Sequence, residues 1–240
     1  MNRNEIFQAL AQLRKGLLRM IIAIVLVGFC LFPFSKTLLR HLYSTNLRVD
    51  LVAFGIPETF LSLLKLTLYA SLFFSVPIIF YQVWKCFAPM FRLKGLKSET
   101  PILLTAIFLF YLGAFFCYFV TLPFGVQFLL GYQSAHIKPM ISVAKYISFC
   151  TVFLFGFGLT FELPLILALL SYINVVKVAF LTRNRRYAIL LIVVAAAILT
   201  PTPDIFNLAL MGVPLYLLFE IGVLLAKIIE RKKAVSVPSI

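Results

Sequence analysis

Residues 102–122 read ILLTAIFLFYLGAFFCYFVTL and contain no charged side chain. An α-helix rises 1.5 Å per residue and the hydrocarbon core of a bilayer is about 30 Å thick, so roughly 20 apolar residues cross it. This run therefore predicts a transmembrane helix.

The composition of the whole chain leads to the same conclusion. Hydrophobic residues make up 62% of the 240 residues, charged residues make up 12%, and the mean hydropathy is +1.05. Soluble domains contain roughly 45–50% apolar and about 25% charged residues. A water-soluble core cannot bury so much apolar surface, which excludes a soluble enzyme, a disordered tail and a disulfide scaffold.

Five more apolar stretches flank this run on both sides. Together they predict an all-α integral membrane protein with six transmembrane helices, in a single domain over residues 1–240. The expected spans are 17–35, 58–82, 101–122, 145–171, 187–200 and 205–226, followed by a basic tail at 227–240. The fifth apolar run is only about 20 Å long, so its hairpin with the sixth span is expected to be recessed in the bilayer.

Prolines are expected to bend several of these helices. Pro33, Pro77, Pro164 and Pro214 lie inside or at the ends of four spans. A proline inside a helix removes one backbone hydrogen bond and kinks the helix. The sequence therefore predicts a curved bundle.

The basic residues predict the orientation. Four of them lie in each of four segments on one side: the N-terminus, the second–third connection, the fourth–fifth connection and the tail. The connections on the opposite side hold only Lys36, Arg40, Arg48, Lys138 and Lys145. The positive-inside rule then places both termini in the cytoplasm. The net charge of +14 is explained by orientation and by contact with anionic lipids, with no need for nucleic acid.

No catalytic or metal-binding pattern is present in the sequence. There is no Ser/His/Asp set, no HExxH motif and no P-loop, and the cysteines form no CxxC pair, so neither enzyme activity nor a metal or cofactor is expected. The histidines, His41 and His136, are predicted to lie isolated in loops. The cysteines are interpreted as small buried hydrophobic residues; they are Cys30, Cys86, Cys117 and Cys150.

Glu162 is the most informative polar residue inside a span, because a carboxyl group there costs a few kcal/mol. It lies two residues before Pro164. Two roles are open: a functional one, as a polar or proton-sensitive contact, and a structural one, as a carboxyl group that is hydrogen-bonded to a neighbouring helix. Lys65 is interpreted as a structural residue whose amine reaches the outer surface. Glu220 is left open between these roles. Gly156 and Gly158 indicate close helix packing.

An ordered series of motifs resembles one family, TatC, the multi-span core subunit of the twin-arginine protein translocase. The series covers about residues 10–226. Its matching pieces are Pro57-Glu58-x-Phe60 with Lys65; Pro77-x-x-x-Tyr81-Gln82-x-Trp84-x-x-x-x-Pro89; Phe110-x-x-Gly113-x-x-Phe116-x-Tyr118 with Pro123; Tyr146-x-x-Phe149; Phe157-Gly158-x-x-Phe161-Glu162-x-Pro164; Arg186-Tyr187; Thr200-Pro201-x-Pro203-Asp204; and Pro214-x-x-x-Leu218-Phe219-Glu220.

The resemblance implies a cupped six-helix molecule in the bacterial cytoplasmic membrane, with an organellar membrane as the alternative. It implies work with TatA- and TatB-type single-span subunits and with other copies of this chain. It also implies reception of twin-arginine signal peptides and export of folded proteins driven by the proton-motive force. The outer hairpin would contact a partner through Thr200, Pro203 and Asp204.

The chain departs from the family pattern where the resemblance places signal-peptide binding. Gln12 stands beside Arg14 in place of the family's acidic residue, and Gly95 stands six residues past Pro89 in place of a glutamate. Glu99 follows four residues later and either takes over this role or is an unrelated surface charge. The candidate binding residues are therefore Glu99, Arg14, Gln12 and Pro89.

Two alternative functions remain open from the sequence. One is an ion-coupled small-solute transporter that uses Glu162 as a proton relay, although no internal repeat supports it. The other is a TatC-like assembly protein that has lost signal recognition, because Gln12 and Gly95 replace acids.

Overall fold

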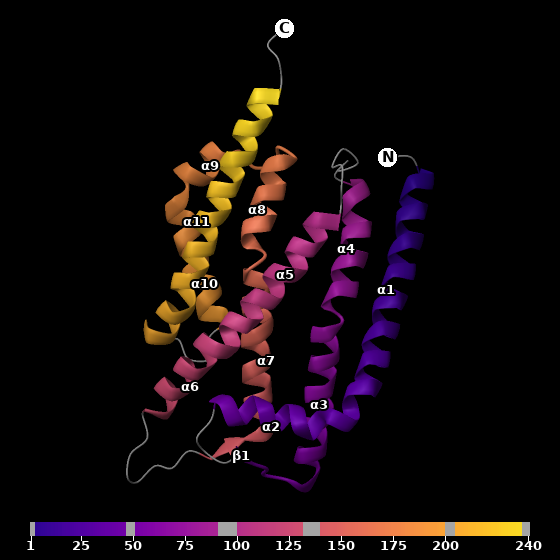
Figure 1. The fold of residues 1–240 in the computed structure, drawn as a ribbon, viewed down its shortest axis with the longest axis vertical. Coiled ribbons are helices and arrows are strands. Elements are labelled where there is room, and N and C mark those ends of the chain that lie inside the picture. The colour runs from indigo at the N-terminus through magenta and orange to yellow at the C-terminus, as the bar shows by residue number, and fades with distance from the viewer. Residues whose placement is uncertain (1–2, 47–50, 91–99, 132–139, 200–204, 237–240) are drawn as a thin grey trace. The chain divides into compact units, whose positions relative to one another are not determined.

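The computed structural model describes residues 3–46, 51–90, 100–131, 140–199 and 205–236 (Figure 1). These residues form two compact units. Unit 1 comprises Met1–Ile107 and Val126–Thr151, and unit 2 comprises Phe108–Gly125 and Val152–Ile240. Each unit is described by itself.

Unit 1 is built around the first three long helices. They are α1 (Arg3–Leu31), α3 (Ile56–Phe74) and α4 (Val76–Met90). Helix α1 packs along both α3 and α4. Two glycines allow this approach: a Cβ at Gly28 would lie 3.4 Å from Cβ of Ser71, and a Cβ at Gly16 would lie 3.6 Å from Oε1 of Gln82. Small residues at such contacts let helix backbones approach closely in lipid.

The bends predicted at Pro33 and Pro77 are present. Pro33 lies in a 3₁₀ turn, η1 (Phe32–Phe34), where α1 ends. Helices α3 and α4 form a broken span bent by 51°, with Ser75 between them and Pro77 in the first turn of α4. Because proline has no N–H and its ring clashes with the preceding turn, the helix breaks just before it.

An amphipathic helix, α2 (Ser35–Asn46), follows the first span. The sequence analysis missed it, and the prediction that His41 lies in a loop is wrong, because His41 is inside α2. Leu38, Leu39 and Leu42 pack against a buried cluster. That cluster consists of Leu66, Val143 and Ile147, and exposed Lys36 and Arg40 lie away from it.

A short parallel strand pair supplements the helices of unit 1. Strand β1 (Leu51–Val52) pairs with β2 (Ile141–Ser142), with Leu51 opposite Ile141 and Val52 opposite Ser142. The all-α prediction did not include this pair. Because each strand has two residues, the pair ties two connections together and leaves the helical class unchanged.

Helices α5 (Thr100–Phe116) and α7 (Val143–Thr160) each contribute residues to both units. Between them, a π-helical turn (Cys117–Thr121) leads into α6 (Leu122–Leu130). Pro123 is the second residue of α6 and follows the turn after Leu122. A π-turn there is consistent with the ring clash that proline imposes on the preceding turn.

The remaining helices belong to unit 2. They are α8 (Leu163–Tyr172), α9 (Val178–Arg183), α10 (Arg185–Leu199) and α11 (Ile205–Ser236). Helix α8 packs extensively on α11, and α10 also packs on α11. Pro164 lies in the first turn of α8, just after the break that separates α8 from α7, as predicted. Helix α11, in contrast, continues through Pro214 without a break.

Length and hydropathy identify candidate membrane spans within the described residues, while the predicted span boundaries remain predictions. Four described helices are long and apolar enough to cross a membrane, and the bent pair α3 and α4 makes a fifth. The fifth predicted span corresponds to α10, whose 15 residues cover only about 22 Å. The six-span count and the cytoplasmic termini remain predictions. Cys117 and Cys150 are buried as expected, whereas Cys30 is exposed on α1, so that expectation was wrong for Cys30. The side chain of Cys86 and all of His136 lie outside the described residues.

Candidate functional site

The buried carboxyl group of Glu162 lies at the break between α7 and α8. Helix α7 ends at Thr160 and α8 begins at Leu163, so Glu162 is the residue that precedes the new helix. The backbone tightens here, because the Glu162 N–H donates to the Leu159 carbonyl at 3.2 Å. Pro164 has no N–H to offer the preceding turn. The chain therefore breaks at this point and places the Glu162 side chain at the junction.

The end of α7 that precedes Glu162 is tightly packed against α5 through aromatic side chains and glycines. A Cβ at Gly158 would lie 2.6 Å from the Phe110 ring, and a Cβ at Gly113 would lie 2.7 Å from the Phe157 carbonyl oxygen. The Phe116 ring lies 5.9 Å from the Phe157 ring and 5.8 Å from the Phe161 ring, centroid to centroid. The interpretation of Gly158 as a packing residue is thus confirmed.

Helix α11 packs close to the start of α8. A Cβ at Gly222 would lie 3.0 Å from Cα of Pro164 and 2.7 Å from Cδ1 of Leu167. Pro164 itself is buried. Because α5 packs on α7 and α11 packs on α8, both helices that flank the break are held in place.

The hydrogen bonding of the Glu162 carboxyl group is incomplete within the described residues: the Phe110 backbone lies within hydrogen-bonding reach of the carboxyl group, but Oε1 has no partner. Its residue is only 7% exposed, and Oε1 has no hydrogen-bond partner among the described residues. A buried polar atom without a partner costs about 1–3 kcal/mol. The described residues also contain no group of three or more His, Cys, Asp or Glu that could hold a metal ion. This carboxyl group can therefore offer a hydrogen bond to a group that reaches it, but the described residues give it no metal centre.

Glu220 has partners, which answers the question that the sequence left open. Its Oε2 accepts a hydrogen bond from Arg185 Nη2 at 3.1 Å, and its Oε1 accepts one from the Tyr216 hydroxyl at 3.0 Å. The Arg185 side chain is 45% exposed and that of Glu220 is 25% exposed. This ion pair joins α10 to α11 at a partly exposed position, which favours a structural role.

The polar residues of unit 1 are also paired. Lys65 Nζ donates to Ser148 Oγ at 2.7 Å, and the same amine lies 5.9 Å from the centre of the Tyr69 ring. Ser148 Oγ in turn donates to the Ala144 carbonyl at 2.8 Å. Lys65 therefore joins α3 to α7, in agreement with the structural interpretation.

Glu58 joins the segment before α3 to β2. Its Oε1 accepts a hydrogen bond from Ser142 Oγ at 2.5 Å, and its Oε2 accepts one from the Phe54 N–H at 2.6 Å. Glu58 appeared in the sequence only as a motif residue with no assigned role. Ser142 and Ser148 were missed because no local pattern distinguishes a serine that bonds a distant charged residue.

The residues predicted to bind signal peptides are only partly described. Arg14 is exposed on α1. Gln12 lies on α1 and Pro89 on α4, but their side chains lie outside the described residues, as does the whole of Glu99. The contact between Gly16 and Gln82 places the N-terminal half of α1 along α4, with the N-terminus of α1 beside the C-terminal end of α4 (Figure 1). Gln12 and Pro89 are thus carried by neighbouring helix ends.

The residues predicted for the outer hairpin cannot be placed. Thr200, Pro203 and Asp204 all lie outside the described residues. The structure describes the two helices that they connect, α10 and α11, which pack against each other.

Comparison with known proteins gives a consistent result over nearly the whole chain. The family model described as Sec-independent protein translocase protein (TatC) matches residues 8–214. The chain is 35% identical to the Sec-independent protein translocase protein TatC of Desulforapulum autotrophicum over 230 residues, which is 93% of this chain and 84% of that protein. It is 34% identical to the protein of the same name from Escherichia coli strain K12, over 91% of this chain and 86% of that protein.

A solved structure is similar to the structure of this chain as well. It is described as a crystal structure of the twin-arginine translocase receptor TatC, and it superimposes with a TM-score of 0.77 at 33% sequence identity. The match covers 92% of this chain and 99% of the other. At this identity and coverage, the two chains share both fold and family.

Proposed function

This chain belongs to the family of Sec-independent protein translocase TatC proteins, and we propose that it is the translocase subunit that receives twin-arginine signal peptides. It is a multi-pass protein of the bacterial cytoplasmic membrane that serves the export of folded proteins. The observation that carries the proposal is the match to a structure described as a translocase receptor, over 92% of this chain.

The receiving surface is proposed to lie around the N-terminus of α1 and the C-terminal end of α4. Arg14 and Gln12 are on the first of these helices and Pro89 is on the second. Their contact through Gly16 and Gln82 supports a shared surface. Glu99 follows α4 in the sequence, nine residues after Met90.

Recognition is proposed to depend on the carboxylate of Glu99. An arginine guanidinium and a carboxylate form two parallel hydrogen bonds, so a carboxylate suits a paired-arginine signal. The segments expected on the cytoplasmic side carry only three acids, Glu5, Glu99 and Glu230, among many bases. Because the surrounding charge repels arginine, one well-placed acid has to provide the attraction.

Glu162 is proposed to make a polar contact inside the membrane during transport. Its carboxyl group is buried at a helix break and Oε1 lacks a partner among the described residues, which supports a contact that forms with another molecule. TatA- and TatB-type single-span subunits are the proposed partners, together with further copies of this chain. The outer hairpin with Thr200, Pro203 and Asp204 is a second proposed partner contact.

The proposed role involves binding and positioning, without a covalent reaction. An ion-coupled transporter that uses Glu162 as a proton relay would need further titratable groups near it, and the aromatic packing at the end of α7 that precedes Glu162 gives no support for such a chain of groups. The assembly protein without signal recognition differs from the proposed function only in its binding of signal peptides.

An export assay separates these functions. In cells whose only TatC-type protein is this chain, a folded reporter with a twin-arginine signal should reach the outer side of the membrane. The control is the same reporter with a twin-lysine signal, which should stay inside. Export of neither reporter, with the chain present in the membrane at normal levels, would contradict the proposal.

A further inference from the structure

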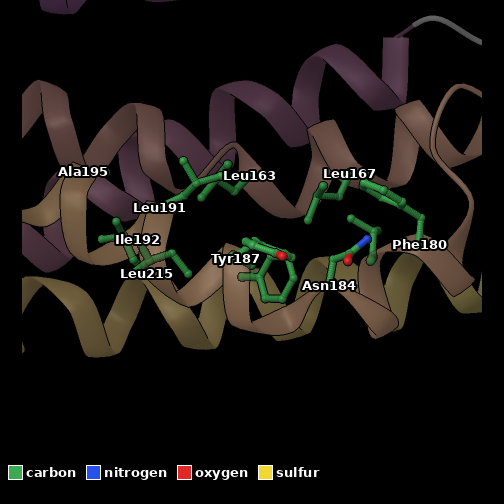
Figure 2. Close-up of a pocket in the computed structure, with 12 residues that line it drawn as sticks. Leu163, Leu167, Phe180, Asn184, Tyr187, Leu191, Ile192, Ala195 and Leu215 are labelled. Atoms are coloured by element: carbon green, nitrogen blue, oxygen red, sulfur yellow. The ribbon is translucent and has the colours of Figure 1, made fainter.

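Unit 2 contains an apolar slot between α8, α9, α10 and α11 (Figure 2). Its volume is about 670 Å³, within the range of roughly 300–1,000 Å³ that is usual for ligand pockets. Figure 2 shows Leu163 and Leu167 on one side of the slot and Tyr187 and Asn184 on the opposite side. Apart from Asn184 and the Tyr187 hydroxyl, the side chains that line the slot are hydrocarbon.

Basic residues flank the polar part of this slot. Arg183 and Arg186 adjoin Asn184 and Tyr187 in the chain, and both arginines are exposed. The Arg186 guanidinium lies 4.9 Å from the centre of the Tyr187 ring, and its Nη2 donates to the Tyr187 hydroxyl at 3.2 Å. Arg186 is therefore held against a residue that lines the slot.

The charge of these two arginines is not neutralised by the described part of unit 2. Arg185, which lies between them in the chain, pairs with Glu220 at 3.1 Å. Within the described residues, neither Arg183 nor Arg186 forms an ion pair with a carboxylate. An apolar slot with Arg186 held beside a lining residue, and with Arg183 next to the lining residue Asn184 in the chain, is complementary to an amphipathic anion.

The short helix α10 brings the lipid headgroups toward this rim. Its 15 residues cover about 22 Å, against a hydrocarbon core of about 30 Å. A span shorter than the core thins the bilayer locally. Thinning moves the phosphate groups toward Arg183, at the end of α9, and Arg186, in the first turn of α10.

From these observations we propose that the slot holds one acyl chain of an anionic phospholipid, whose phosphate contacts Arg183 and Arg186. The hydrocarbon lining accepts the chain and the two guanidinium groups select the negative headgroup. A zwitterionic lipid binds in the same slot with lower affinity, because the two arginines repel its ammonium group. This site does not depend on signal-peptide recognition.

Lipid retention by the purified full-length protein tests the proposal. The protein in detergent is titrated with phosphatidylglycerol or with phosphatidylcholine of identical chains, and bound lipids are counted by native mass spectrometry. Replacing Arg183 and Arg186 together by glutamine should weaken phosphatidylglycerol binding roughly ten- to thirty-fold and leave phosphatidylcholine binding unchanged. Replacing both by lysine should keep most of the preference.

Two further variants distinguish this site from general charge and from bulk lipid. Lys227→Gln with Arg231→Gln removes the same charge elsewhere in unit 2 and should not change retention. Ala188→Leu with Ala195→Leu adds side-chain volume inside the slot and should lower retention of both lipids, with the unfolding temperature measured alongside to check that the variant is folded.

Three results would overturn the proposal. The first is equal retention of the two lipids by the unmodified protein. The second is an equal loss of phosphatidylglycerol in the Lys227 and Arg231 control. In the third, filling the slot leaves lipid retention unchanged but abolishes co-purification of a single-span protein, which would show that the slot receives a helix.

Discussion

The charged side chains bonded in unit 1 contrast with one acidic side chain of unit 2, Glu162. In unit 1, Lys65 and Glu58 are each bonded to a serine from the region of α7, at 2.7 Å and 2.5 Å. In unit 2, Glu162 is buried at the break between α7 and α8, and its Oε1 has no partner among the described residues.

The presence or absence of a hydrogen-bond partner distinguishes polar groups with a structural role from those with a functional role. A paired charge lowers the free energy of the folded chain by its hydrogen bonds, whereas an unpaired buried carboxyl group costs about 1–3 kcal/mol. A costly group at a helix break inside a membrane is expected to serve function. The two units thus predict different outcomes when their polar residues are replaced.

The largest effect is expected at the glycines that hold the Glu162 junction. Gly113→Val would force side-chain atoms against the Phe157 carbonyl and the Phe161 ring, which a Cβ would already approach to 2.7 Å. Overpacking of this kind costs about 1–3 kcal/mol or more, and here a backbone atom must move. The variant should be lost from the membrane or unfold at a clearly lower temperature.

Gly212→Ala is the matched control for this prediction. It is a helical glycine in the same unit, but a Cβ there would meet nothing within 4 Å. Because alanine favours a helix by up to about 1 kcal/mol relative to glycine, the control should be neutral or slightly stabilising. If Gly113→Val unfolds at the same temperature as Gly212→Ala, the conclusion that α5 and α7 are closely packed at Gly113 is contradicted.

The next effect concerns export. Glu162→Ala should lower the export rate roughly ten- to a hundred-fold, as expected for a charge-assisted hydrogen bond of about 1.5–3 kcal/mol, and Glu162→Gln should lower it less. Neither change should lower the amount of membrane-inserted protein or its unfolding temperature. The measurement is export of a twin-arginine reporter beside thermal unfolding of the same preparations. Normal export by the alanine variant would make Glu162 a structural residue.

Glu58 should show the opposite behaviour. Glu58→Ala leaves the Ser142 hydroxyl and the Phe54 N–H without their acceptor, so the free energy of unfolding should fall measurably. Export per molecule of inserted protein should be unchanged. Replacing the exposed Glu230 by glutamine removes the same charge without a bonded partner and should leave stability within about 0.5 kcal/mol.

A double-mutant cycle between Glu58→Ala and Ser142→Ala sharpens this test. If the two residues stabilise the fold through each other, the double variant should be less destabilised than the sum of the single variants. If the destabilisation by the two single variants is additive, Glu58 and Ser142 do not stabilise the fold through each other. If Glu58→Ala lowers export by more than it lowers the amount of inserted protein, Glu58 has a functional role and does not differ from Glu162.

The smallest effect is expected at the ion pair between Arg185 and Glu220. Because the Arg185 side chain is 45% exposed, water and salt screen the pair, and such pairs contribute about 0–1 kcal/mol. Arg185→Gln should therefore change the unfolding free energy by no more than this, measured by denaturant titration at low and high salt. A loss several times larger would show that the pair is as important as the buried contacts of unit 1.

Hydropathy and proline positions predicted most of the helical architecture because lipid imposes simple requirements. A spanning segment must be apolar and helical, so the runs were visible without tertiary information. Breaks at Pro77 and Pro164 followed from the missing N–H of proline. The unbroken helix at Pro214 shows that neighbouring packing can override this local signal.

Features that depend on distant residues escaped prediction. Helix α2 was missed because Lys36, Arg40 and His41 interrupt its apolar residues, which face a cluster formed far along the chain. The strand pair β1 and β2 forms only where two distant connections come together. The hydrogen bond between Glu58 and Ser142 joins residues that are 84 positions apart, so no local pattern predicts it. Glu162 was identified because a carboxyl group in an apolar run stands out by itself. The roles of Glu99, Gln12 and Pro89 rest on the family pattern.

The most direct test of the central claim is the binding of a twin-arginine signal peptide to the purified chain, compared with a twin-lysine peptide. Glu99→Gln should weaken twin-arginine binding roughly ten- to a hundred-fold, because a charge-assisted pair contributes about 1.5–3 kcal/mol. Gln12→Glu, which restores the family's carboxylate, should strengthen it. Equal binding of the two peptides by the unmodified chain, with no change in Glu99→Gln, would contradict the claim that this chain is the signal receptor.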